Sequence, residues 1–166
     1  MPRVLRLPSA SRTVRLVNPA LSDLPAFLTR EGGLRSGLMI PHVTAAALAS
    51  ENKTLAHPAS VDSIPTSANK EDHVSMGVGA ARKAAQVAAN SARILAIELI
   101  AACQALEFLR PLTTSAPLEA VHALVRQAVP AYDEDRSLAA EIEAVAARIL
   151  GGEVEAAAAA VCGRLD

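Results

Sequence analysis

The sequence predicts an all-α fold, a bundle built on long helices, and three observations lead to that prediction. The chain of 166 residues is 51% hydrophobic but only 2% aromatic, so its core must be made of Ala, Leu, Val and Ile. Small aliphatic side chains suit closely packed helices better than a β-sandwich, which favours β-branched and aromatic residues. Long stretches also run without a helix-breaking residue. A chain of this length can bury a core of its own.

Charge and hydropathy exclude several classes of partner. The formal net charge of −1 gives no sign of a nucleic-acid or anionic-membrane partner. The longest apolar run, residues 94–103, contains Glu98 and is shorter than the ~20 residues that cross a bilayer. The first residues, MPRVLRLPSASR, lack the apolar core of a secretory signal. Cys103 and Cys162 are expected to be reduced. We therefore expect a cytoplasmic protein.

Residues 1–35 are expected to form an irregular N-terminal segment. Val14 and Leu16 fit a short strand or the frayed end of a helix, and the Asn-Pro and Leu-Pro pairs that follow predict turns.

Residues 36–166 are predicted to form a helical-bundle domain, beginning with a helix over residues 38–55. Pro41 falls in its first turn, where a missing N–H is harmless. This helix is apolar nearly all round, which predicts burial on most sides. A second helix should run from about Ser75 to Arg110, a length of about 50 Å at ~1.5 Å per residue. The few remaining helices cannot cover so long an apolar helix, so we expect the chain to be part of something larger.

Two shorter helices are predicted next, over residues 117–129 and 138–150. Ser137 is placed to cap the second of them. Tyr132 lies between them in an acidic turn, and we expect it to be peripheral. The alanine-rich tail, residues 153–166, is predicted to be helical.

One segment, the polar loop of residues 56–76, departs from the helical pattern. It gathers charged and amide side chains and two histidines between alanine-rich helices, and Pro58 and Pro65 keep it non-helical. Polar groups inside an apolar body are destabilising by several kcal/mol unless they are paired. Such a segment is either a solvated loop or one wall of a site.

Common chemical motifs do not account for this loop. There is no glycine-rich phosphate loop and no zinc pattern, and His57 and His73 are too far apart for a ligand pair on one helix face. Asp62, His73 and a nearby serine could form a hydrolase triad, but the sequence has neither a nucleophile elbow nor an oxyanion hole. His42 and His122 lie on predicted helices, and we interpret them as packed or exposed rather than functional.

Three stretches together carry a family resemblance: NPALSDLPAFLT at residues 18–29, SGLMIPHVTAAALASENKTLAHPASVDSIPTSANKEDHVSM at residues 36–76, and LAIELIAACQALEF at residues 95–108. They resemble the C-terminal part of the aromatic amino acid ammonia-lyase family. The resemblance covers most of residues 11–150, and the first ten residues lie outside it. The wording SVDSIPTSAN-x-EDHVSM is specific, and its EDH form points to the histidine ammonia-lyase branch.

The resemblance implies the ammonia-lyase fold, a homotetramer with sites shared between chains, and a role in histidine catabolism. The reaction would eliminate ammonia from L-histidine to give trans-urocanate. The substrate of the complemented chain would be L-histidine or a related amino acid. By resemblance, Glu71 is the catalytic glutamate, Met39 lines the substrate pocket, and Asn69 and Lys70 bind substrate. A glutamate there can hold a cation and transfer protons. The alternatives are a solvated carboxylate for Glu71 and core packing for Met39.

The sequence also departs from the family. Lys70 stands where the family has glutamine, and Pro41-His42 replaces Ala-Gln. A lysine beside Glu71 is expected to pair with it and to place a positive charge where the substrate ammonium should bind. The departure therefore bears on substrate preference and activity.

The family's electrophile is a methylidene-imidazolone group made from an internal Ala-Ser-Gly, and this sequence contains no Ala-Ser-Gly. We expect no cofactor in this chain, no activity from the chain alone, and a requirement for an upstream half that carries the tripeptide. Two alternatives remain: a non-catalytic helical module that associates with itself or with a full-length lyase, and a degenerate lyase remnant.

Overall fold

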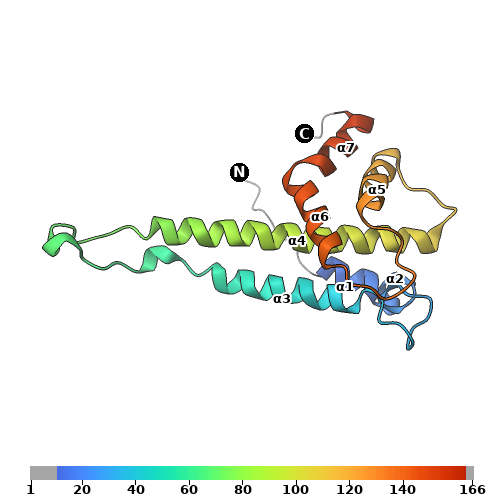
Figure 1. Cartoon of the computed structure of the whole chain (residues 1–166), viewed down its shortest axis with the longest axis horizontal. Helices are drawn as coiled ribbons and strands as arrows, with labels where there is room; N and C mark the ends of the chain where they lie inside the picture. The colour runs from blue at the N-terminus through green and yellow to red at the C-terminus, as the bar shows by residue number, and fades with distance from the viewer. Residues whose placement is uncertain (1–10, 164–166) are drawn as a thin grey trace.

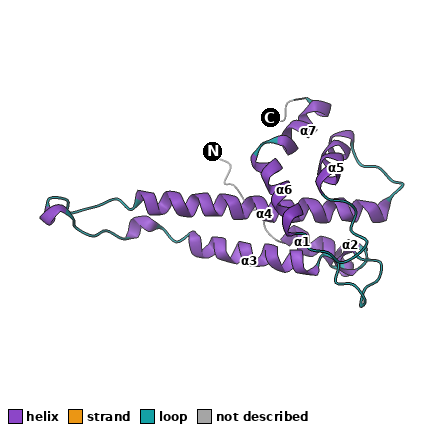
Figure 2. Ribbon diagram, in the orientation of Figure 1, coloured by secondary structure: helices purple, strands orange, loops and turns teal. Residues whose placement is uncertain are grey.

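A computed structural model describes residues 11–163 and confirms the all-α fold class (Figure 2). The described part contains helices, 3-10 turns and two isolated bridges, but no strand. The helices are α1 (Ser11–Val17), α2 (Pro19–Ser22), α3 (Met39–Leu55), α4 (Gly77–Leu109), α5 (Ala116–Ala128), α6 (Ala139–Leu150) and α7 (Glu153–Cys162). Single 3-10 turns cover Ala26–Leu28, Ala59–Val61 and Ser67–Asn69.

Helices α3 and α4 form a long antiparallel hairpin that is the spine of the molecule (Figure 1). The other helices gather around the C-terminal half of α4, while the polar loop closes the hairpin at its opposite end. The four predicted helices from α3 to α6 are confirmed, with ends within two residues of the expected positions. No helix among residues 11–163 combines the length and the apolar character needed to cross a membrane.

The apolar core lies where α4 meets α5, α6 and α7. Ile100 of α4 packs there with Val125 of α5 and Val145 of α6, and alanines of α4 allow these helices to approach closely. A second cluster joins α1 and the 3-10 turn that follows α2 to the same stretch of α4. This core is aliphatic, as the composition predicts.

Polar contacts hold α3 and α4 together further out. Asn90 Nδ2 donates to Glu51 Oε2 at 2.8 Å and to Asn52 Oδ1 at 3.0 Å, and Gln86 Nε2 donates to Asn90 Oδ1 at 3.0 Å. Asn90 and Asn52 are 1% and 3% exposed. These paired amides fix the register of the hairpin, because a shifted register would leave them buried without partners.

The expectation of an irregular segment is wrong for residues 11–22, which form α1 and α2; of the two alternatives for Val14 and Leu16, the helix is confirmed and the strand is wrong. Thr13 and Val17, four residues apart, are buried, so packing stabilises a helix too short to persist alone. Asn18 caps α2 through its side chain, which accepts from Ala20 N at 3.0 Å. The first ten residues of the expected segment lie outside the described part of the chain.

Two further local predictions are wrong. Ser137 does not cap α6; the cap position belongs to Leu138, and Arg136 instead stabilises the entry by bonding Glu141 and the carbonyl of Pro130. Tyr132 is buried rather than peripheral. Helix α7 ends at Cys162, and residues 164–166 of the predicted helical tail lie outside the described part.

The expected burial of α3 on most sides is also wrong for this chain. Ile40 and Val43 of α3 are exposed, because α4 covers only one face of the helix. The helix therefore presents an apolar outer surface.

Candidate functional site

Hydrogen bonds join the two legs of the polar loop, which are the segments before and after its turn at residues 67–69. The Ser63 hydroxyl accepts from Val74 N at 2.8 Å and donates to Val74 O at 3.2 Å, which ties the two legs together. At its base, Lys83 of α4 donates to the carbonyl of His57 at 2.7 Å.

Nearer the tip, the legs pair through their backbones. Thr66 N donates to Glu71 O at 3.1 Å, and Glu71 N donates to Thr66 O at 3.4 Å. The turn between them holds Ser67, Ala68 and Asn69 with φ of 54°, 55° and 64°. Left-handed conformations are unfavourable for non-glycine residues, and such strain gathers at functional sites.

The structure brings three of the four predicted site residues together. Asn69, Lys70 and Glu71 are consecutive at the tip of the loop, and all three are exposed. Glu71 Oε2 accepts a hydrogen bond from Thr66 Oγ1 at 2.7 Å. The expected ion pair between Lys70 and Glu71 is not formed; the Glu71 carboxylate accepts from the Thr66 hydroxyl instead. The expectation of pairing is therefore wrong for this structure.

Met39 does not meet Glu71 within this chain. Met39 is the half-buried first residue of α3, and the polar loop begins beyond the other end of that helix. The 17 residues of α3 span about 25 Å at ~1.5 Å per residue. The two predicted residues therefore lie at opposite ends of the hairpin.

The other candidates in the loop form no centre of their own. Asp62, His57 and His73 are exposed, and the described residues include no group of three or more His, Cys, Asp or Glu side chains that could hold a metal. Cys103 is buried, which raises the pKa of its thiol to about 11, so it is a poor nucleophile at neutral pH.

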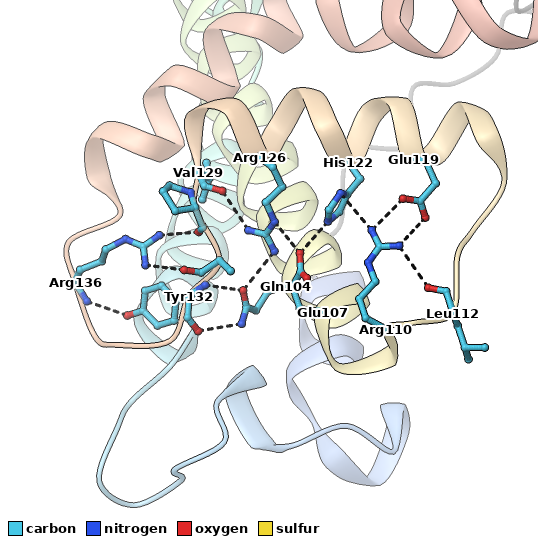
Figure 3. A network of polar contacts seen from close by, with 12 residues as sticks. Gln104, Glu107, Arg110, Leu112, Glu119, His122, Arg126, Val129, Tyr132 and Arg136 are labelled. Atoms are coloured by element: carbon cyan, nitrogen blue, oxygen red, sulfur yellow. Dashed lines mark hydrogen bonds and ion pairs between the residues drawn. The ribbon is translucent and has the colours of Figure 1, made fainter.

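A second polar cluster lies in the other half of the molecule, between α4 and α5 (Figure 3). Gln104 bonds the backbone of Tyr132 twice, donating to its carbonyl at 2.9 Å and accepting from its N–H at 2.8 Å. Glu107 Oε1 lies 3.0 Å from both His122 Nε2 and Arg126 Nε. Sequence reasoning missed this cluster, although Gln104 and Glu107 share a face of an apolar helix at a spacing of three.

The charges of this cluster are mutually satisfied. Burial alone would raise the pKa of Glu107, but hydrogen bonds from His122 and Arg126 outweigh it and hold that pKa below its usual value. A bidentate bond from Arg110 and the N–H of Thr114 likewise lower the pKa of Glu119. Groups so fully paired serve the fold, so the polar loop remains the better candidate for chemistry.

The fold and the loop define an all-α protein whose long helical hairpin presents a rigid polar turn. A family model described as aromatic amino acid lyase matches residues 5–127, and the chain belongs to that family.

Relatives in the family are close in sequence. The chain is 60% identical over 155 residues to a histidine ammonia-lyase of Symbiobacterium thermophilum, covering 93% of this chain and 31% of that protein. It is 62% identical over 136 residues to the human histidine ammonia-lyase, covering 82% of this chain and 21% of the relative. The chain thus spans about a fifth to a third of the length of these relatives.

Solved structures agree. A crystal structure of histidine ammonia-lyase from Trypanosoma cruzi matches with a TM-score of 0.86 and 54% identity, over 90% of this chain and 29% of that one. A tyrosine aminomutase from Streptomyces globisporus matches with a TM-score of 0.85 and 39% identity, over 91% and 29%. The ammonia-lyase fold predicted from the sequence is therefore confirmed for this part of the larger fold.

Proposed function

We propose that this chain supplies one wall of the active site of a histidine ammonia-lyase, which eliminates ammonia from L-histidine to give trans-urocanate. One observation carries the proposal: the motif SVDSIPTSANKEDHVSM forms a pinned turn that presents Glu71 at the end of the hairpin. The identity to histidine ammonia-lyases over most of the chain supports it.

Glu71 is the catalytic residue of the proposal. Its carboxylate is exposed and forms no ion pair with residues 11–163, so it is available to a substrate imidazole or ammonium group. Asn69 and Lys70 are its neighbours at the substrate. Water must be excluded from the site by other polypeptide, because nothing in the described chain covers the turn.

The electrophile must come from elsewhere. The family's methylidene-imidazolone group activates the amino group of the substrate as a leaving group, and it is made from Ala-Ser-Gly. The residues present here do not fit its formation, since the sequence lacks that tripeptide. We therefore propose that the chain is inactive alone and works with polypeptide that carries it.

Assembly of several chains is the second part of the proposal. Met39 and Glu71 lie at opposite ends of α3, so one substrate can contact both only where hairpins from different chains meet. A homo-oligomer would satisfy this requirement and would also cover the exposed outer surface of α3.

The decisive experiment is complementation. The purified chain is mixed with a separately produced polypeptide that carries the family's Ala-Ser-Gly portion, and urocanate is followed by its absorbance. We expect activity from the mixture, and little from a mixture made with Glu71→Gln. No gain over the Ala-Ser-Gly polypeptide alone would reject the proposal, and urocanate formation by the pure chain would reject its claim of inactivity.

One observation favours a non-catalytic alternative. The hairpin exposes Val43, Val61, Ile64 and Val78, which suits a helical module that associates with itself or with a complete lyase. Sedimentation equilibrium tests this: oligomers that form without any gain of activity on complementation would favour the module over the enzyme.

A further inference from the structure

The hydroxyl of Thr66 has no role in the proposed function so far. It lies 2.7 Å from Glu71 Oε2, a distance typical of a strong hydrogen bond to a carboxylate. The same two residues also pair through both of their backbone N–H groups. Glu71 is therefore held to Thr66 at three points.

Stability of the fold does not explain this arrangement. Thr66 and Glu71 are exposed, and between exposed groups a hydrogen bond adds little because water competes for both partners. The turn that joins them is strained, with three successive non-glycine residues at positive φ. The three hydrogen bonds between Thr66 and Glu71, which we call the clamp, are thus kept on a strained turn and without burial. This indicates that the position of the carboxylate is what matters.

We propose that Thr66 is a positioning residue, which holds the Glu71 carboxylate in one orientation toward the substrate. The inference rests on the proposed function of Glu71. Threonine suits the task because branching at Cβ restricts its χ1 rotamers. The bonds between Ser63 and Val74 fix the legs of the turn below it, so the hydroxyl is presented from a rigid base.

The geometry leaves half of the carboxylate free. Oε2 is engaged by Thr66, and Oε1 has no described partner. A substrate N–H can therefore be received by Oε1 without breaking the clamp. Holding the acceptor in place before the substrate binds reduces the loss of freedom on binding.

The first test asks whether the clamp exists in solution, and it uses the full chain without any assay of activity. Side-chain scalar couplings of Glu71 are measured by NMR in Thr66→Val, which removes the hydroxyl, and in Thr66→Ser, which keeps it. Thr54→Val, an exposed threonine at the end of α3, is the matched control. We expect Glu71 rotamers to average in Thr66→Val only. Identical couplings in Thr66→Val and the wild type would overturn the inference.

The second test uses the complemented enzyme. We expect Thr66→Val to lower kcat/KM by about 10- to 100-fold, since small displacements of a catalytic group have effects of that order. Thr66→Ser should restore most of the loss, and Thr54→Val should have no effect. In a Glu71→Gln background, Thr66→Val should lower kcat/KM little further, because the residue that it positions is already changed. A merely structural role of Thr66 would instead give a further loss.

The results distinguish failure of the proposed function from failure of the positioning role of Thr66. If the wild-type mixture makes no urocanate, the proposed function fails and the catalytic part of this inference fails with it, whatever the NMR couplings show. If the wild-type mixture is active but Thr66→Val behaves like Thr54→Val, the positioning role is overturned while the proposed function stands.

Discussion

Two regions of the molecule hold their helices together by opposite means. In the outer region, residues 48–91, which we call the arm, the only two buried residues are Asn52 and Asn90. In the remaining described residues, 11–47 and 92–163, which we call the head, the buried residues are mainly aliphatic. The head thus has a core of its own, whereas the arm has a polar register and an uncovered apolar surface.

The difference shows what each region is built for. Hydrophobic burial is the dominant stabilising contribution to folding, so the head can fold around its own contacts. Paired amides contribute less stability but define one alignment. The arm therefore has a fixed shape, while its exposed Val61, Ile64 and Val78 remain available to other polypeptide. This arrangement fits the assembly proposed above, in which the arm presents its turn to other polypeptide.

The largest expected effect comes from truncating the core of the head. Ile100 is 2% exposed, and Ile100→Ala should lower the free energy of unfolding by about 2–5 kcal/mol, through lost burial and a residual cavity. Ile64→Ala in the arm is the matched control, since Ile64 is 61% exposed and its loss should change stability by less than about 0.5 kcal/mol. Urea denaturation measures both. Equal losses of stability would mean that Ile64 is buried in solution, and the arm would then not differ from the head in having an exposed apolar surface.

A smaller effect is expected from the polar register of the arm. Asn90→Ala leaves Asn52 and Glu51 without their partner, which should cost about 1–3 kcal/mol. Replacing both asparagines by leucine should be milder than the single change, because no buried amide is then orphaned. Urea denaturation of the single and double variants checks this. A double variant weaker than the single one would mean that the amides contribute net stability rather than register.

Acid should affect the head before the arm. Hydrogen bonds from arginine lower the pKa of Glu119 and of Glu143, and the backbone N–H groups of Ser36 and Gly37 help to lower that of Asp135. A carboxylate whose pKa is lowered by folding stabilises the fold above its ordinary pKa. That contribution is lost as pH falls below about 4.5 for the glutamates. In the arm, the hydrogen bonds among Asn52, Gln86 and Asn90 join amides, which do not titrate.

Glu107 also has a lowered pKa, so Glu107→Gln tests at a single position whether paired carboxylates of the head stabilise the fold. At pH 7 the variant should be less stable by about 1–2 kcal/mol, because the charged bonds to His122 and Arg126 are weakened. The difference should shrink as the pH is lowered toward 3, where the wild-type carboxylate is protonated as well. Thermal unfolding followed by circular dichroism at several pH values measures it, with Glu155→Gln, an exposed carboxylate of α7, as control. If the difference in stability between Glu107→Gln and the wild type did not change with pH, the ionised Glu107 carboxylate would not be what stabilises the head.

Sequence reasoning worked where local pattern decides structure. The absence of a breaker predicted α4, which is confirmed. Pro58 and Pro65 predicted a non-helical loop; no α-helix forms there, but short 3-10 turns cover Ala59–Val61 and Ser67–Asn69. It failed where distant contacts decide. Helix α1 depends on packing against α4, and Tyr132 is buried in a cluster with Ala101 and Ala105 of α4. Neither contact can be read from local periodicity.

The candidate site divides in the same way. The motif identified the loop and its exposed Glu71, but the left-handed turn at residues 67–69 contains no glycine, so composition gave no sign of it. The clamp from Thr66 depends on that turn. Lys70 was expected to pair with Glu71 because the two are adjacent in sequence, whereas the carboxylate bonds the hydroxyl of Thr66, which the turn brings next to it.

The smallest expected effect concerns Lys70, and it sharpens the contrast by separating stability from function in the arm. Lys70 is exposed and forms no ion pair with Glu71, so Lys70→Gln should change the free energy of unfolding by no more than about 0.5 kcal/mol. In the complemented enzyme the same change would remove a positive charge near the proposed position of the substrate ammonium, so KM for L-histidine should fall. Urea denaturation and initial rates on the same preparations measure both quantities. A loss of stability above about 1 kcal/mol would mean that Lys70 helps to stabilise the turn, because an exposed lysine without such a role contributes less. The tip of the loop would then contribute to folding as well as to the proposed substrate contact.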